Sequence, residues 1–193
     1  SNYCEIWSEK ATILGAIRPI ADTWGVTLRV CHGFGSTGME GQVGQFFEDL
    51  AKRSITVFFL GDHDPSGHVI EQDIHRRVQI ASGTSFRMKR LAIHPADIQA
   101  FHLPPQALKA NDSRRASFQR RFGADAPTVE LDALPASELR RRVETAVGAL
   151  VDPARWERQI AVQQIELNCI LEFAEQMKAL PQLAAQRLQG GQA

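Results

Sequence analysis

The chain has few cysteines, no excess of charge of either sign and no long apolar run. Its three cysteines lie far apart in 193 residues and form no Cys-x-x-Cys pair, which argues against a disulfide framework and a structural zinc site. Thiols used in this way indicate a cytoplasmic protein. No run of about 18 apolar residues occurs, so no membrane association is expected.

Basic and acidic residues balance, at 22 each, so the composition neither indicates nor excludes a polyanionic partner. Residues 87–121, however, include eight basic residues and only two acidic ones. A basic segment of this kind is a candidate for contacts with the phosphates of DNA, although a solvated helix face is the alternative for its four arginines from 114 onward. The candidates are Arg87, Lys89, Arg90, Lys109, Arg114, Arg115, Arg120 and Arg121.

Short β-favouring runs alternate with helical patterns along the first half of the chain. The expected strands cover residues 3–8, 26–31, 55–60 and 86–94, and helical patterns with an apolar stripe lie between them. The run 55–60 is apolar throughout, which is typical of a strand covered on both faces. The order predicts an α/β fold with a parallel, Rossmann-like sheet and helices on both of its faces.

The rest of the chain predicts a further strand at 128–131, a helix at 135–150 and a long helix from 153 to about 180. We expect one domain over residues 3–150, with a helical extension and polar tail at 151–193 packed on it. The chain enters its first strand within two residues of its start. This indicates a further N-terminal domain upstream of residue 3.

Three acids follow two of the predicted strands. Glu9 follows the first strand, and Asp62 and Asp64 follow the apolar run 55–60. The carboxyl ends of parallel strands share one edge, and residues i and i+2 point the same way, so these carboxylates should converge there. They would repel one another unless a cation lay among them, and oxygen ligands favour Mg²⁺, with Mn²⁺ as an alternative. The other interpretation of Asp-x-Asp is a turn followed by a helix cap.

The same residues resemble the Toprim domain. Trp7-Ser8-Glu9-Lys10 and Gly61-Asp62-His63-Asp64-Pro65-Ser66-Gly67 are most similar to its version in the A subunit of type IIB topoisomerases (topoisomerase VI) and in the related meiotic double-strand-break proteins. The resemblance extends to residues 91–97 and 129–134 and covers roughly residues 4–150.

The resemblance implies that Glu9, Asp62 and Asp64 hold Mg²⁺ beside a scissile DNA phosphate, and that Lys10 offsets the charge that develops there. It also implies a location at the nucleoid and leaves open a homodimer and an ATPase partner subunit. In that family the nucleophile is a tyrosine on an upstream winged-helix domain. The only tyrosine of this chain, Tyr3, heads a strand, so the chain would supply the metal-binding half of a strand-cleavage site and be inactive in transesterification by itself.

Two alternatives stay open. The loop at residues 32–38 lacks the Gly-x-Pro-Asp that is common in those relatives. The Toprim domain also serves nucleases in which metal-activated water attacks the phosphate, so a hydrolytic nuclease of a defence system or mobile element is one alternative. A non-catalytic domain that binds DNA or a protein partner is the other.

Overall fold

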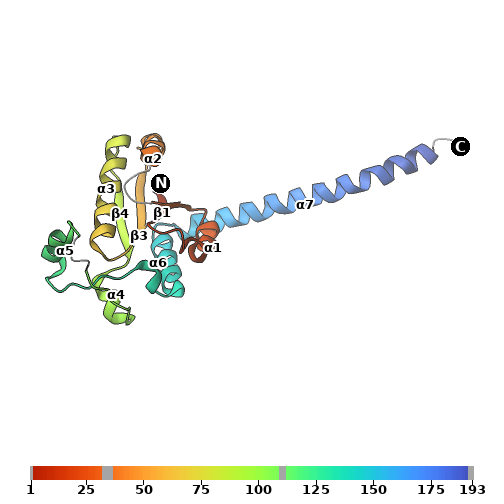
Figure 1. Cartoon of the computed structure of the whole chain (residues 1–193). Helices are drawn as coiled ribbons and strands as arrows, with labels where there is room; N and C mark the ends of the chain where they lie inside the picture. The colour runs from red at the N-terminus through yellow and green to blue at the C-terminus, as the bar shows by residue number, and fades with distance from the viewer. Residues whose placement is uncertain (1, 32–36, 109–111, 191–193) are drawn as a thin grey trace. The chain divides into compact units, whose positions relative to one another are not determined.

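The computed structural model describes residues 2–31, 37–108 and 112–190. A parallel four-stranded sheet forms the centre of the first compact unit, Ser1–Leu150 (Figure 1). The strands lie in the order β2-β1-β3-β4 and every neighbouring pair is parallel. Their bounds are β1 (Asn2–Ser8), β2 (Thr27–Val30), β3 (Ser54–Leu60) and β4 (Arg87–Ala92). The predicted α/β fold with a parallel sheet is confirmed.

Helices cover both faces of this sheet, as expected. The helices α1 (Leu14–Trp24) and α6 (Ala136–Gly148) contribute to the core on one face, and α2 (Thr37–Asp49) and α3 (Pro65–Ser82) contribute to the core on the other. The central strand β3 supplies both cores because its side chains alternate, with Phe58 on the first face and Phe59 on the second. This explains why its sequence is apolar throughout.

A buried ion pair joins β1 to β2. The Glu5 side chain is fully buried, and its carboxylate accepts hydrogen bonds from Arg29 Nε at 2.6 Å, Trp7 Nε1 at 2.6 Å and the Tyr3 hydroxyl at 2.8 Å. Burial, with the charge of Glu5 as a smaller cause, raises the pKa of Tyr3 to about 12. Tyr3 therefore has a structural place at the start of the strand, whereas Glu9 follows the other end.

The expected strand at 128–131 is not formed. Thr128 and Val129 make only isolated antiparallel bridges, to Gln106 and His63. The Leu131 amide donates to Asp62 Oδ1 at 2.7 Å instead of to a neighbouring strand, and a 3₁₀ helix, η1 (Leu131–Ala133), begins there. This segment therefore lies against the loop after β3. Two short helices, α4 (Pro95–Ala100) and α5 (Arg115–Phe122), precede it.

The second compact unit, Val151–Ala193, contains one long helix, α7 (Pro153–Gly190). The helix runs about ten residues past the end expected from the sequence, through Pro181. Of the helices in the described ranges, none combines the length and the apolar character needed to cross a bilayer.

Candidate functional site

The first two predicted acids meet at the carboxyl edge of the sheet. Glu9 extends the pairing of β1 with β3, because its amide donates to Leu60 O at 2.9 Å. Its Oε2 accepts a hydrogen bond from the Asp62 amide at 3.0 Å. Burial and the nearby charge of Asp62 raise the pKa of Glu9 to about 7, against the favourable bond from that amide. Glu9 is thus a partly buried carboxylate beside a second acid.

Asp62 is almost completely buried, at 8% exposure. Its Oδ1 accepts the Leu131 amide at 2.7 Å and lies 3.3 Å from Lys10 Nζ. Burial raises the pKa of Asp62, although both of these partners act in the opposite direction. Asp62 is therefore held in place by two segments far apart in the sequence.

Asp64 lies at the N-terminus of α3. Its Oδ1 accepts the Gly67 amide at 2.6 Å and caps the helix, as the turn-and-cap interpretation expected. Its charge also raises the pKa of both Glu9 and Asp62. His63, between the two aspartates, turns away, and its Nδ1 lies 3.0 Å from His68 Nε2. The turn-and-cap role of Asp64 is therefore present, and its charge acts on the other two acids.

Two glycines make room for the Glu9 carboxylate. A Cβ added to Gly61 would lie 2.9 Å from Glu9 Oε2 and 2.5 Å from the Phe59 ring. A Cβ added to Gly67 would lie 2.9 Å from the same oxygen and 2.5 Å from Asp62 O. The spacing Gly61-Asp-x-Asp-x-x-Gly67 therefore leaves a space around these acids that larger residues would fill.

Replacing Gly67 with alanine should destabilise the first unit. The new methyl group would meet the Asp62 backbone, which cannot move as easily as a side chain, so we expect a loss of about 2 kcal/mol in the free energy of unfolding. Gly41→Ala in α2 is the matched control, because a Cβ there meets nothing within 4 Å and should stabilise the helix by about 0.5 kcal/mol. Urea unfolding measures both variants, and a neutral Gly67→Ala would contradict the close approach.

Lys10 lies at the same edge but is already bound. Its Nζ is 3.0 Å from Glu130 Oε2, 3.0 Å from Asp132 Oδ2 and 3.3 Å from Asp62 Oδ1. Burial lowers the pKa of Lys10, but the three carboxylates together raise it by more than burial lowers it. The ammonium therefore stays charged. The sequence analysis missed Glu130 and Asp132 as members of the site. The sequence signal that could have indicated them is the pair of acids on either side of the apolar residue Leu131.

Arg90 supports the loop that carries the two aspartates. Its side chain is 8% exposed. Its guanidinium donates from Nη1 to Gly61 O at 2.9 Å and Asp62 O at 3.0 Å, and from Nη2 to Gly67 O at 3.2 Å. Its Nε donates to Glu71 at 2.8 Å. This candidate DNA contact is therefore directed to the interior, where it holds the backbone on both sides of Asp64.

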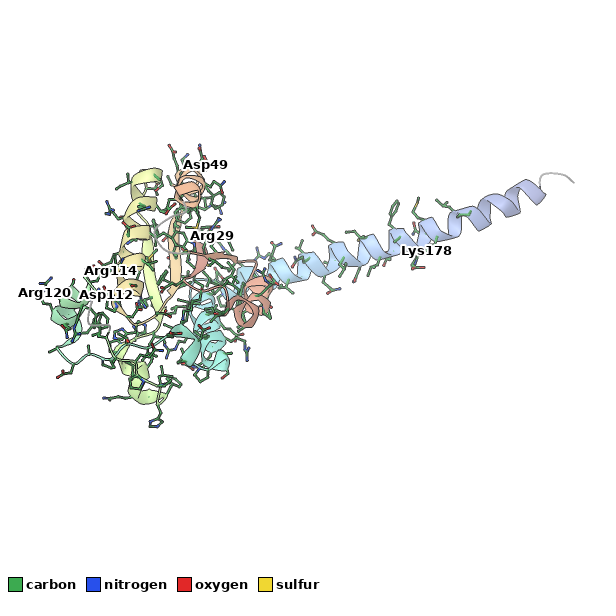
Figure 2. The ribbon with its side chains drawn as sticks, in the orientation of Figure 1. Arg29, Asp49, Asp112, Arg114, Arg120 and Lys178 are labelled. Atoms are coloured by element: carbon green, nitrogen blue, oxygen red, sulfur yellow. The ribbon has the colours of Figure 1, made fainter. Side chains whose placement is uncertain are left out.

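The remaining basic candidates divide between two places. Arg87 and Lys89 are exposed on the edge strand β4 and line a groove of about 610 Å³. On the α5 side, Arg114 Nη1 donates to Ser66 Oγ at 2.9 Å, next to Asp64, and Figure 2 shows Arg120 further out. The other candidates on α5 are Arg115, which is half-buried, and Arg121, which is exposed. Lys109 lies outside the described residues.

The candidate acids do not form a ready-made metal site, since no three acidic, histidine or cysteine side chains in the described ranges are grouped to hold an ion. One oxygen of each acid is used by the protein. In hydrogen bonds between described residues, however, Glu9 Oε1, Asp62 Oδ2 and Asp64 Oδ2 take no part. Carboxylate oxygens of this kind, beside a glycine-lined space, are the ligand type that Mg²⁺ and Mn²⁺ prefer.

Comparisons with known proteins do not identify this site. No protein-family model matches the sequence, and no curated protein matches it.

Proposed function

We propose that the first unit is a Mg²⁺-dependent, DNA-acting domain of the Toprim type, most similar to that of a topoisomerase VI A subunit, which supplies the metal-binding half of a strand-cleavage site. One observation carries the proposal. The Glu9 carboxylate, after β1, accepts the amide of Asp62, after β3, so acids from two adjacent parallel strands meet at the edge where such folds bind ligands.

The residues of the chain would share the work on a phosphodiester. Glu9, Asp62 and Asp64 would hold the ion, which supplies charge stabilisation at the phosphate oxygens. Lys10 would add positive charge at the same edge. Exposed basic residues on β4 and α5 would bind neighbouring phosphates, and this contact would keep the protein at the nucleoid in the cytoplasm. A second copy of the chain and an ATPase subunit are the protein partners that the proposal includes.

Hydrolysis is the second candidate reaction, and the position of Tyr3 at the start of β1 favours it over transesterification. The hydroxyl of the only tyrosine in this chain binds Glu5 at the start of β1, whereas the acids follow the ends of β1 and β3. This chain by itself therefore offers no tyrosine to attack a phosphate beside Asp62. Water would be the nucleophile in a reaction that this chain performs alone.

Cleavage of supercoiled plasmid tests the proposal. The full-length natural protein should cut with Mg²⁺ and stop cutting with EDTA, and Asp62→Asn should reduce the rate by at least about a hundredfold, because a ligand with a neutral amide binds the ion poorly. Asp49→Asn, at the exposed end of α2 (Figure 2), is the matched control and should cut normally. Unchanged cleavage by Asp62→Asn would contradict the metal assignment.

The products distinguish the candidate reactions. A DNA end linked to protein indicates transesterification, whereas a free 5′-phosphate indicates hydrolysis. If the protein binds plasmid but never cuts it under any divalent ion, the proposal of a cleavage site fails and a binding domain is the better description. Gel-shift binding of Asp62→Asn, measured in parallel, ensures that a loss of cutting is not a loss of DNA binding.

A further inference from the structure

Lys10 is surrounded in the way that a bound cation would be. Its ammonium lies within 3.0–3.3 Å of one oxygen each from Asp62, Glu130 and Asp132. Its side chain is only 23% exposed, although lysine ammonium groups are usually in water. The three acids come from two segments, the end of β3 and the residues around η1. A single positive charge therefore joins these segments at the carboxyl edge.

Asp62 belongs to two groups of acids at once. Its amide donates to Glu9 Oε2, and its Oδ1 faces Lys10. In two-metal phosphoryl-transfer sites, a pair of ions about 3.5–4 Å apart clamps the reacting oxygens. At the edge of this sheet Asp62 touches Glu9 through its amide and the Lys10 ammonium through Oδ1, so a side-chain cation already lies among Asp62, Glu130 and Asp132.

We infer that the Lys10 ammonium permanently occupies the second cation position, so that the site binds one divalent ion, held by Glu9, Asp62 and Asp64. The inference rests on the proposed function and deepens it. Glu130 and Asp132 hold Lys10 in place and do not bind metal in the natural protein. Lys10 supplies the charge that a second ion would supply in a two-metal site, without needing to be loaded from solution.

Removing the ammonium should open the second position. Lys10→Met keeps the length of the side chain and leaves Asp62, Glu130 and Asp132 without their shared cation, so a second divalent ion should take its place. Titration with Mn²⁺ by calorimetry should give one ion per chain for the wild type and two for Lys10→Met. Adding Glu130→Gln and Asp132→Asn to Lys10→Met should return the count to one.

Two further variants complete the set. Lys10→Arg keeps a positive charge at the position and should bind one ion. Lys178→Met is the matched control, because Lys178 pairs with a single acid, Glu175, at 2.7 Å, and its loss should leave the count at one. Circular dichroism of each variant establishes that the fold is retained.

Electron paramagnetic resonance gives a second readout that does not depend on counting ions by heat. Wild-type protein saturated with Mn²⁺ should show the six-line spectrum of isolated ions, and Lys10→Met should show the broadened spectrum of a coupled pair. A coupled pair in the wild type, or a single ion in folded Lys10→Met, would overturn the inference while the proposed metal site stands. Absence of Mn²⁺ binding in every variant would overturn both.

Discussion

Replacing Arg90 with leucine should lower the free energy of unfolding of the first unit by about 3–5 kcal/mol. Leucine would leave Glu71 without its ion pair, and Gly61 O, Asp62 O and Gly67 O would each lose a charged donor. Removing one partner of a buried charged pair costs the desolvation of the group left behind, which is larger than the strength of the original contact.

The comparison with lysine separates charge from shape. Arg90→Lys keeps the charge but presents a single ammonium in place of the planar fork that reaches several carbonyls, so we expect roughly half of the loss. Arg18→Leu, on the exposed side of α1, should change stability by less than about 0.5 kcal/mol. Urea unfolding in EDTA measures all three variants. An Arg90→Leu protein as stable as Arg18→Leu would show that the loop around Asp62 does not depend on the guanidinium.

Glu9→Gln should stabilise the metal-free protein at alkaline pH. The pKa of Glu9 is raised to about 7, so the fold favours its protonated form. The resulting stability is complete below the ordinary glutamate pKa and is lost as the pH rises through about 7. One pKa unit corresponds to about 1.4 kcal/mol, and with allowance for the partial exposure of Glu9 we expect Glu9→Gln to be more stable by about 2 kcal/mol at about pH 8.

The pH dependence is the decisive part of this measurement. In EDTA, Glu9→Gln and wild type should have nearly the same unfolding free energy at about pH 4.5, where both carry a neutral side chain, and should diverge as the pH rises. With added Mg²⁺ at about pH 8, the wild type should become the more stable of the two proteins, because only the wild type has the Glu9 carboxylate to bind the ion. Glu48→Gln, an exposed residue of α2, is the control for general charge effects. A difference that does not change with pH would show that burial and the neighbouring acids do not raise the pKa of Glu9.

Much of the fold could be predicted from local patterns. The strands β1, β2, β3 and β4 appear where short apolar or β-branched runs predicted them, because these runs are separated by helical stripes of period 3.6. The same order places Glu9 and Asp62 after neighbouring strands. Their approach at one edge follows from parallel pairing, which the alternation of strands and helices already indicated.

The strand expected at 128–131, which the structure does not form, shows what local sequence patterns cannot predict. Val129 and Leu131 are buried, as a strand pattern requires, but burial alone does not choose the hydrogen-bond partner. The Leu131 amide goes to the Asp62 carboxylate, 69 residues earlier in the chain. That contact arises from the packing of two loops, and neither sequence window contains a signal for it.

Arg90 was misleading for a similar reason. In the sequence it is one of eight basic residues in a segment rich in arginine, and the pattern predicts a surface role for all of them alike. In the structure its neighbour Lys89 is exposed, whereas Arg90 faces the opposite side of β4 and binds the carbonyl groups of Gly61 and Asp62 in the loop after β3. Alternation along a strand shows which residues share a face, but whether that face is buried or exposed depends on the segments that pack on it.

The sequence by itself determined the class of fold and the three acids at its carboxyl edge, because strand alternation, turn residues and residue types are local properties that parallel pairing converts into position. Only the tertiary structure decided which charges those acids meet. The distances from Lys10 to Glu130 and Asp132, and from Arg90 to the loop backbone, depend on loops that pack from distant parts of the chain. The free energy of placing a buried charge depends on all of its neighbours at once, so it cannot be read from any single segment.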